Sequence, residues 1–170
     1  MTQANVRLIL HFEDEPSSAG WIPGALFNKF LMEYQEWESA GEEAFCEEPA
    51  NTFMFTLGPP SGPVTICYKI CQTAKEFADQ LSSNEATSSA AIAILDVWTT
   101  EQDGKLIAHI HDVLPNALNH LTPARIFVLT AYPRSLPKEL ADKIPPENVF
   151  SKPLDAIVFM PILMKQLGIK

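Results

Sequence analysis

The chain has 170 residues, of which 46% are apolar, and a formal net charge of −9 at pH 7. This length provides one full hydrophobic core and is short for two domains, so we expect residues 1–170 to form a single domain. The negative charge argues against a nucleic-acid backbone or an anionic membrane as a partner. The N-terminus lacks a basic segment followed by a long apolar stretch, and the longest apolar run, residues 156–164, is too short to span a bilayer. We therefore expect a cytoplasmic protein.

The cysteines, Cys46, Cys67 and Cys71, do not have the spacing of a disulfide framework or a zinc site. They form no CxxC pair, and no cluster of histidine and cysteine ligands accompanies them. We expect ordinary reduced thiols.

The first half of the chain predicts a strand, a helix and a hairpin. Residues 6–12 are rich in apolar side chains, which predicts a central strand that is buried on both faces. Pro23 suits the first turn of a helix that continues to about Trp37. Residues 52–57 and 64–70 are rich in β-forming residues and flank a turn rich in proline and glycine, which predicts a hairpin.

The second half of the chain alternates helices with strands. Thr73 and Glu76 have the spacing of a capping box and open a helix. The further pattern predicts strands at 90–95, 126–129 and 148–151, and helices at 105–114, after Ser135, and at the C-terminal end as far as Gly168. This alternation predicts an α/β fold with a parallel sheet.

Four of the predicted strands end in polar residues. Asp96 closes one apolar run, and Glu13 and Asp14 follow another. Thr130 and Lys152 follow the last two strands. Because functional groups in open parallel sheets gather at the carboxyl ends of strands, we expect these side chains to be neighbours. Several carboxylates in one place repel one another unless a lysine and a hard dication compensate, and oxygen ligands point to Mg²⁺.

This set of groups suits phosphoryl transfer. A carboxylate beside Mg²⁺ can attack phosphorus and form an aspartyl phosphate, so Asp96 is a candidate nucleophile. The transferred group carries negative charge on its equatorial oxygens, and its transfer needs a metal, a cation and a hydrogen-bond donor. Lys152 offers the cation and Thr130 the hydroxyl.

Four motifs follow one another along the chain: Phe12-Glu13-Asp14-Glu15-Pro16, Leu95-Asp96 with Asp103-Gly104, Leu129-Thr130-Ala131 and Ser151-Lys152-Pro153. In order and strand context they resemble the receiver domain of two-component response regulators, in its stand-alone, chemotaxis-regulator-like form. The resemblance covers residues 8–16 and 65–170. It implies a flavodoxin-like, doubly wound, five-stranded parallel sheet in the order 2-1-3-4-5. It also implies an insertion at about residues 38–63, with an extra edge strand or hairpin before the second strand.

The resemblance implies a role for each motif residue. Asp96 would accept a phosphoryl group from a histidine kinase or a phosphotransfer protein. Glu13, Asp14 and Asp96 would hold Mg²⁺ together with the main-chain carbonyl of Trp98. Lys152 would pair with the phosphoryl oxygens, and Thr130 would bond the phosphoryl group and shift between inactive and active arrangements. We expect self-phosphorylation and autodephosphorylation chemistry rather than a turnover enzyme, and signalling through protein contacts.

Two positions depart from the receiver pattern. The aromatic residue that receivers often place three positions before the lysine is Val149 here, and Phe150 follows it. The proline often found four positions after the phosphoacceptor is Thr100.

Two other functions stay open. One is a receiver-like binding or adaptor module that no longer cycles phosphate. The other is a phosphatase of the haloacid dehalogenase type, although the acid/base aspartate that such enzymes carry two positions after the nucleophile is Trp98 here.

Two local features also leave alternatives. The segment 156–164 is apolar nearly all round and contains Pro161, so either a helix starts only near this proline or the surface contacts a downstream partner or a second copy. His11 interrupts the first strand, where it either handles protons near the pocket or is a hydrogen-bonded core histidine.

Overall fold

The computed structural model describes residues 5–15, 21–33, 38–39, 45–47, 51–58, 63–83, 91–100, 106–108 and 110–168. The strands in chain order are β1 (Asn5–Phe12), β2 (Glu38–Ser39), β3 (Phe45–Glu47), β4 (Thr52–Gly58), β5 (Val64–Cys71), β6 (Ile92–Asp96), β7 (Trp98–Thr100), β8 (Leu106–Ala108), β9 (Ile126–Thr130) and β10 (Val149–Ser151). The helices are α2 (Trp21–Glu33), α3 (Ala74–Leu81), α5 (Ile110–His120), α6 (Lys138–Ala141) and α7 (Ala156–Leu167), with 3₁₀ turns η1 (Pro123–Arg125), η2 (Pro133–Ser135) and η3 (Pro146–Asn148).

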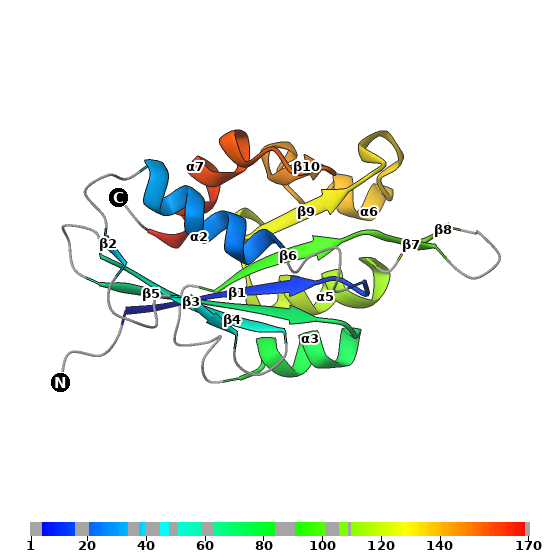
Figure 1. Cartoon of the computed structure of the whole chain (residues 1–170). Coiled ribbons are helices and arrows are strands. Elements are labelled where there is room, and N and C mark those ends of the chain that lie inside the picture. Colours follow the sequence, from blue (N-terminus) through cyan, green and yellow to red (C-terminus); the bar gives the residue numbers. More distant parts are fainter. Residues whose placement is uncertain are drawn as a thin grey trace.

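The main sheet has the strand order β10-β9-β6-β1-β5-β4-β2, with β3 also paired to β4 (Figure 1). Neighbouring strands from β10 to β5 are parallel. Strand β4 is antiparallel to β5 on one side and to the short strands β2 and β3 on the other. Strands alternate with helices along most of the chain, so the predicted α/β class is confirmed.

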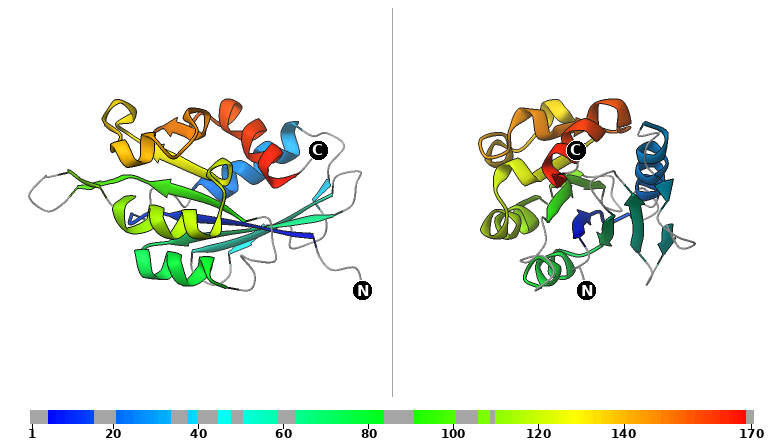
Figure 2. Two further views of the ribbon diagram at one scale, coloured as in Figure 1. Left: turned by 180° about the vertical axis from the view of Figure 1, so that it is seen from behind. Right: turned by 90° about the vertical axis from the view of Figure 1, so that its left-hand side faces the viewer.

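Helices cover both faces of the parallel strands (Figure 2). Side chains of α2 and α7, such as Phe159, pack on one face, and side chains of α3, α5 and α6, such as Phe77, pack on the other. Because side chains alternate along a strand, Ile94 joins the first layer and Leu95 the second. Burial from both sides explains why β6 is apolar at every position before Asp96.

The predicted hairpin is confirmed, and it lies at one edge of the sheet. Strand β4 pairs along its length with β5, from Thr52 opposite Lys69 to Leu57 opposite Val64. Strands β2 and β3, from the same inserted segment, pair with the far side of β4. The insertion at about residues 38–63 therefore widens the sheet on the side away from β10.

The helix predicted at 105–114 is wrong in its first half. Residues 106–108 form β8, which pairs antiparallel with β7, and α5 begins only at Ile110. Residues 97–100 are aromatic and β-branched, which favours a strand, so pairing outweighs the helical spacing of Leu106 and Ile107. Asp103 and Gly104 themselves lie outside the described residues, as does Pro16.

The C-terminal helix α7 begins before Pro161, so the alternative of a start near that proline is wrong. The side chain of Asp155 caps α7 by accepting a hydrogen bond from Ile157 N at 2.9 Å. Gly168 ends it in the left-handed conformation, with φ of 69°. Among the described residues, none of the helices combines the length and the apolar character needed to cross a bilayer.

Candidate functional site

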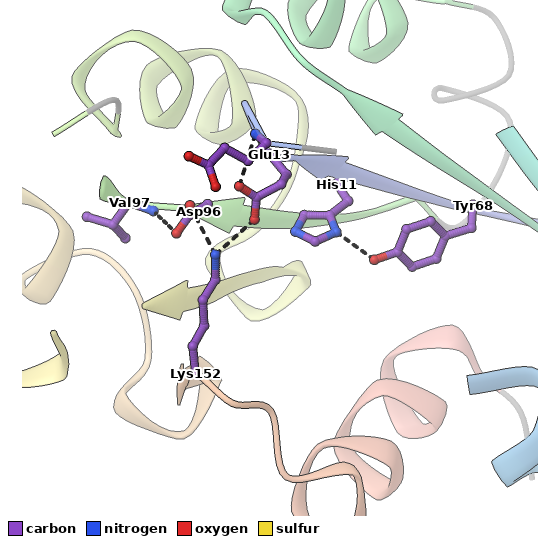
Figure 3. A network of polar contacts seen from close by, with 7 residues as sticks. His11, Glu13, Tyr68, Asp96, Val97 and Lys152 are labelled. Carbon is purple, nitrogen blue, oxygen red and sulfur yellow. Dashed lines mark hydrogen bonds and ion pairs between the residues drawn. The ribbon is translucent and has the colours of Figure 1, made fainter. Parts of the chain in front are cut away.

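Polar residues from four adjacent strands meet at one edge of the sheet, where the parallel strands end. Glu13 follows β1, Asp96 ends β6 and Thr130 ends β9. Lys152 follows β10, the neighbour of β9. Strand order therefore brings together residues that lie up to 139 positions apart in sequence, as predicted from their strand-end positions (Figure 3).

Lys152 bridges two carboxylates. Its Nζ lies 2.8 Å from Glu13 Oε2 and 3.1 Å from Asp96 Oδ2. The side chains of Glu13 and Asp96 are only 3% and 9% exposed, whereas that of Lys152 is 30% exposed. The lysine thus brings a positive charge from the rim of the site to two buried negative charges.

Burial and charge change the protonation of this group. Burial raises the pKa of Glu13 to about 7; the hydrogen bond from Lys152 opposes the rise, and the charge of Asp96 adds to it. Burial lowers the pKa of Lys152, but the hydrogen bond to Glu13 and the charge of Asp96 outweigh burial and raise it overall. Lys152 is therefore charged near neutral pH, and Glu13 is poised to gain or lose a proton there.

Three carboxylates are placed to share a metal ion. Glu13, Asp14 and Asp96 each offer an oxygen, and these oxygens all lie within 4.8 Å of one another. A donor set made of oxygens alone suits a hard dication such as Mg²⁺. The charge also fits, because one lysine does not balance three carboxylates. Trp98 begins β7 two residues after Asp96, and the role of its main-chain carbonyl as a ligand stays a prediction.

Main-chain N–H groups donate hydrogen bonds to the carboxylate of Asp96 and to the hydroxyl of Thr130. Val97 N donates to Asp96 Oδ1 at 2.9 Å, which orients the carboxylate at the end of β6. The buried hydroxyl oxygen of Thr130 accepts a bond from Tyr132 N at 3.0 Å. A hydroxyl that accepts one bond still carries its own proton, so Thr130 keeps a donor for an oxygen bound in the site. The carbonyl of Thr130 accepts a bond from Lys152 N at 2.8 Å, which ties the two loops together.

The position of the receiver aromatic residue holds a small side chain. Val149 is partly buried against the layer of α3, α5 and α6. Phe150 points into the other layer, where its ring centroid lies 5.0 Å from that of Phe159 and 6.1 Å from that of Phe127. Phe150 is only 8% exposed, so it is part of the core. It does not take the place of the aromatic residue that receivers often carry at the position of Val149.

His11 is a hydrogen-bonded core histidine, as one of the two alternatives predicted. Its ring is fully buried, and Nδ1 lies 2.7 Å from the hydroxyl oxygen of Tyr68 on β5. Sequence reasoning did not single out Tyr68. The signal was present, because Tyr68 carries a hydroxyl on a strand, residues 64–70, whose pattern predicts burial.

A scan of the chain against protein-family models gives no match, and a search of curated proteins gives none either.

Proposed function

We propose that this protein is a receiver-type phosphoacceptor that takes a phosphoryl group on Asp96. The observation that carries the proposal is the position of Lys152 Nζ, between the carboxylates of Glu13 and Asp96 at the carboxyl ends of adjacent parallel strands. Two buried carboxylates destabilise the fold unless a lysine and a metal ion compensate their charge. Groups of this kind are typical of functional sites.

The proposed fold is flavodoxin-like. The parallel strands, numbered along the chain, follow the order 2-1-3-4-5 when β1, β5, β6, β9 and β10 are taken in turn. Helices on both faces agree with a doubly wound arrangement. The antiparallel strands β4, β2 and β3 extend the sheet beyond β5, the second strand in this order. The order of the parallel strands is the same with or without them.

In the proposed step, a carboxylate oxygen of Asp96 attacks the phosphorus of the donor. The new O–P bond forms as the P–N bond to a donor histidine breaks, and the bonding electrons leave with the imidazole. Acetyl phosphate would donate in the same way, with cleavage of the P–O bond to acetate. A bound Mg²⁺ supplies charge neutralisation for the phosphoryl oxygens. Lys152 pairs with one of these oxygens, and the hydroxyl of Thr130 donates to another.

The proposed donors are a histidine kinase or a phosphotransfer protein, and the output is a change in protein contacts. Ile157 and Val158 at the start of α7 are 73% and 53% exposed, which makes this helix the best candidate for contact with a downstream partner or a second copy.

Intact-protein mass spectrometry after treatment with acetyl phosphate and Mg²⁺ tests the proposal. We expect one added phosphoryl group in the native chain, none without a divalent cation, and none in Asp96→Asn. Asp142→Asn, which changes an exposed carboxylate outside the site, is the matched control and should label like the native chain. Absence of label in the native chain, or full label in Asp96→Asn, would contradict the proposal.

The second candidate is an adaptor that has kept the pocket but no longer cycles phosphate. Val149 in place of an aromatic residue favours it, because the usual coupling partner of Thr130 is missing. In that case Asp96→Asn would leave the affinity of α7 for its partner unchanged, whether or not acetyl phosphate adds a phosphoryl group to the native chain.

A further inference from the structure

The structure contains a buried polar atom that the proposed chemistry does not use. His11 is fully buried, and its Nε2 has no hydrogen-bond partner among the described residues. The other ring nitrogen, Nδ1, is bonded to Tyr68. Figure 3 shows the His11 ring between Tyr68 and Glu13, with the edge that faces away from Tyr68 turned toward the carboxylate of Glu13. An unpaired polar atom in a core is rare and calls for an explanation.

Hydrogen-bond counting decides which ring nitrogen carries the proton. The His11 ring is fully buried and one of its nitrogens has no partner among the described residues, so the core accommodates the neutral form of the ring. If Tyr68 donates to Nδ1, the proton sits on Nε2, and the Nε2–H is the one unmatched group. If Nδ1 donates instead, the tyrosine proton and the Nε2 lone pair both lack a partner among the described residues. The first arrangement leaves fewer groups unmatched, so the unpaired group is a donor.

The carboxylate toward which this edge of the His11 ring turns already accepts a hydrogen bond from Lys152. Glu13 lies two residues after His11, on the same side of the chain, and its Oε2 accepts a hydrogen bond from Lys152 at 2.8 Å. The same lysine lies 3.1 Å from Asp96. A phosphoryl group on Asp96 would offer Lys152 a more highly charged acceptor than Glu13. Glu13 would then lose the lysine donor at Oε2 and keep the 3.3 Å bond from Glu15 N at Oε1.

We infer that His11 Nε2–H is a reserve hydrogen-bond donor for Glu13, which it takes over when Lys152 moves to a phosphoryl group on Asp96. This inference rests on the proposed function. His11 is then a positioning residue: it keeps the Glu13 carboxylate in place for the metal while the lysine serves the phosphoryl group. His11 is not among the residues whose ligand atoms meet at the metal cluster, so a direct role as a ligand does not explain it.

The exchange also links the site to the sheet edge. Tyr68 holds Nδ1 of the same ring, and Tyr68 stands opposite Phe53 of β4 in the antiparallel register. A shift of the His11 ring toward Glu13 therefore changes the hydrogen bond to β5, beside the inserted strands. With Val149 unable to act as an aromatic switch, this gives the occupied site a route to the rest of the fold.

Nitrogen-15 NMR of the full chain tests the inference. In the native protein without ligand, two-bond correlations should show His11 protonated at Nε2, with the signal assigned by its loss in His11→Gln. Addition of Mg²⁺ and beryllofluoride, which mimics an aspartyl phosphate, should move the Nε2–H proton downfield. Its exchange with water should slow by about tenfold, the effect of one added hydrogen bond of ordinary strength.

Lys152→Met provides an arm that does not depend on phosphorylation. In this variant Glu13 has lost the lysine, so the Nε2–H signal should move in the same direction at pH 8 with no ligand present. The variant Lys165→Met, altered on the exposed side of α7, is the control and should leave the signal where it is in the native chain.

The possible outcomes separate the inference from the proposed function. Protonation at Nδ1 in the native chain overturns the inference. So does an unchanged His11 signal when fluorine NMR shows beryllofluoride bound in the native chain and not in Asp96→Asn. If beryllofluoride does not bind, the proposed function fails, and Lys152→Met alone decides the inference: a shifted signal supports the donor exchange, and an unshifted signal overturns it.

Discussion

The acid site and the His11–Tyr68 pair are both buried polar groups near the same end of β1, and they are accommodated in opposite ways. Glu13 and Asp96 stay next to a cation, Lys152, at 2.8 and 3.1 Å. Among the described residues, none of the cations bonds to His11 or Tyr68, and burial raises the pKa of Tyr68 and lowers that of His11, so both are neutral. The acid site therefore depends on compensating charge, whereas the His11–Tyr68 pair depends on the 2.7 Å hydrogen bond between its two members.

Removal of the compensating charge should have the largest effect. Lys152→Met leaves two buried carboxylates without the cation that compensates them. We expect the free energy of unfolding to fall by about 3 kcal/mol at pH 8, the lower end for a buried ion pair because the lysine is partly exposed. Urea unfolding in the presence of a chelator measures this loss. Lys165→Met, at an exposed position on α7, should change stability by less than about 0.5 kcal/mol. A loss no larger than that of the control would show that the lysine does not stabilise the site.

The raised pKa of Glu13 should make stability depend on pH. The pKa is about 7 in the folded chain and 4.5 ordinarily, so the folded state binds more protons between these values. Stability should therefore fall as pH rises from 4.5 to 7, by about 2 kcal/mol, and Mg²⁺ should reverse the loss.

Glu13→Gln cannot ionise and should flatten this pH profile, as followed by urea unfolding at several pH values. Glu147→Gln, at an exposed carboxylate on η3, should keep the native profile. A native-like decline in Glu13→Gln would assign the pH dependence to another group.

The neutral pair should respond more weakly. Tyr68→Phe keeps the ring and removes the hydroxyl that bonds His11, so we expect a loss of about 1 kcal/mol with little dependence on pH. Tyr132→Phe removes a hydroxyl from a side chain that is 46% exposed and should be nearly neutral. Thermal unfolding of both variants gives the comparison, and equal stability would mean that the Tyr68 bond contributes nothing.

The smallest effect on stability is expected at the exposed start of α7. Ile157→Ser should change the free energy of unfolding by less than about 0.5 kcal/mol, because the side chain is 73% exposed. If α7 binds a second copy, the same change should weaken self-association in concentration-dependent light scattering. Lys165→Met on the same helix should leave self-association as in the native chain.

The sheet was predictable from its apolar runs, and the acid site was predictable from the polar residues that follow those runs. A buried strand reads as an unbroken apolar run, and Asp96, Thr130 and Lys152 each follow such a run in sequence. Parallel order then brings their side chains together without further information.

Other features depend on tertiary contacts that cannot be predicted from the spacing of residues in the sequence. Leu106 and Ile107 have helical spacing, but they pair with β7, because a partner strand is available two residues after Asp96. The bond between His11 and Tyr68 depends on which strand lies beside β1 and in what register, with Ile9 opposite Tyr68. The ion pairs of Lys152 depend on distances, which a motif cannot give.

The most direct test of the central claim is to locate the phosphoryl group on the chain. Borohydride reduces an aspartyl phosphate to homoserine, so reduction after treatment with acetyl phosphate and Mg²⁺, followed by peptide mass spectrometry, identifies the modified residue. We predict homoserine at position 96 and at no other aspartate, and none in Lys152→Met or after removal of the cation. Reduction products at Asp14 or at surface aspartates, with position 96 unmodified, would contradict the account.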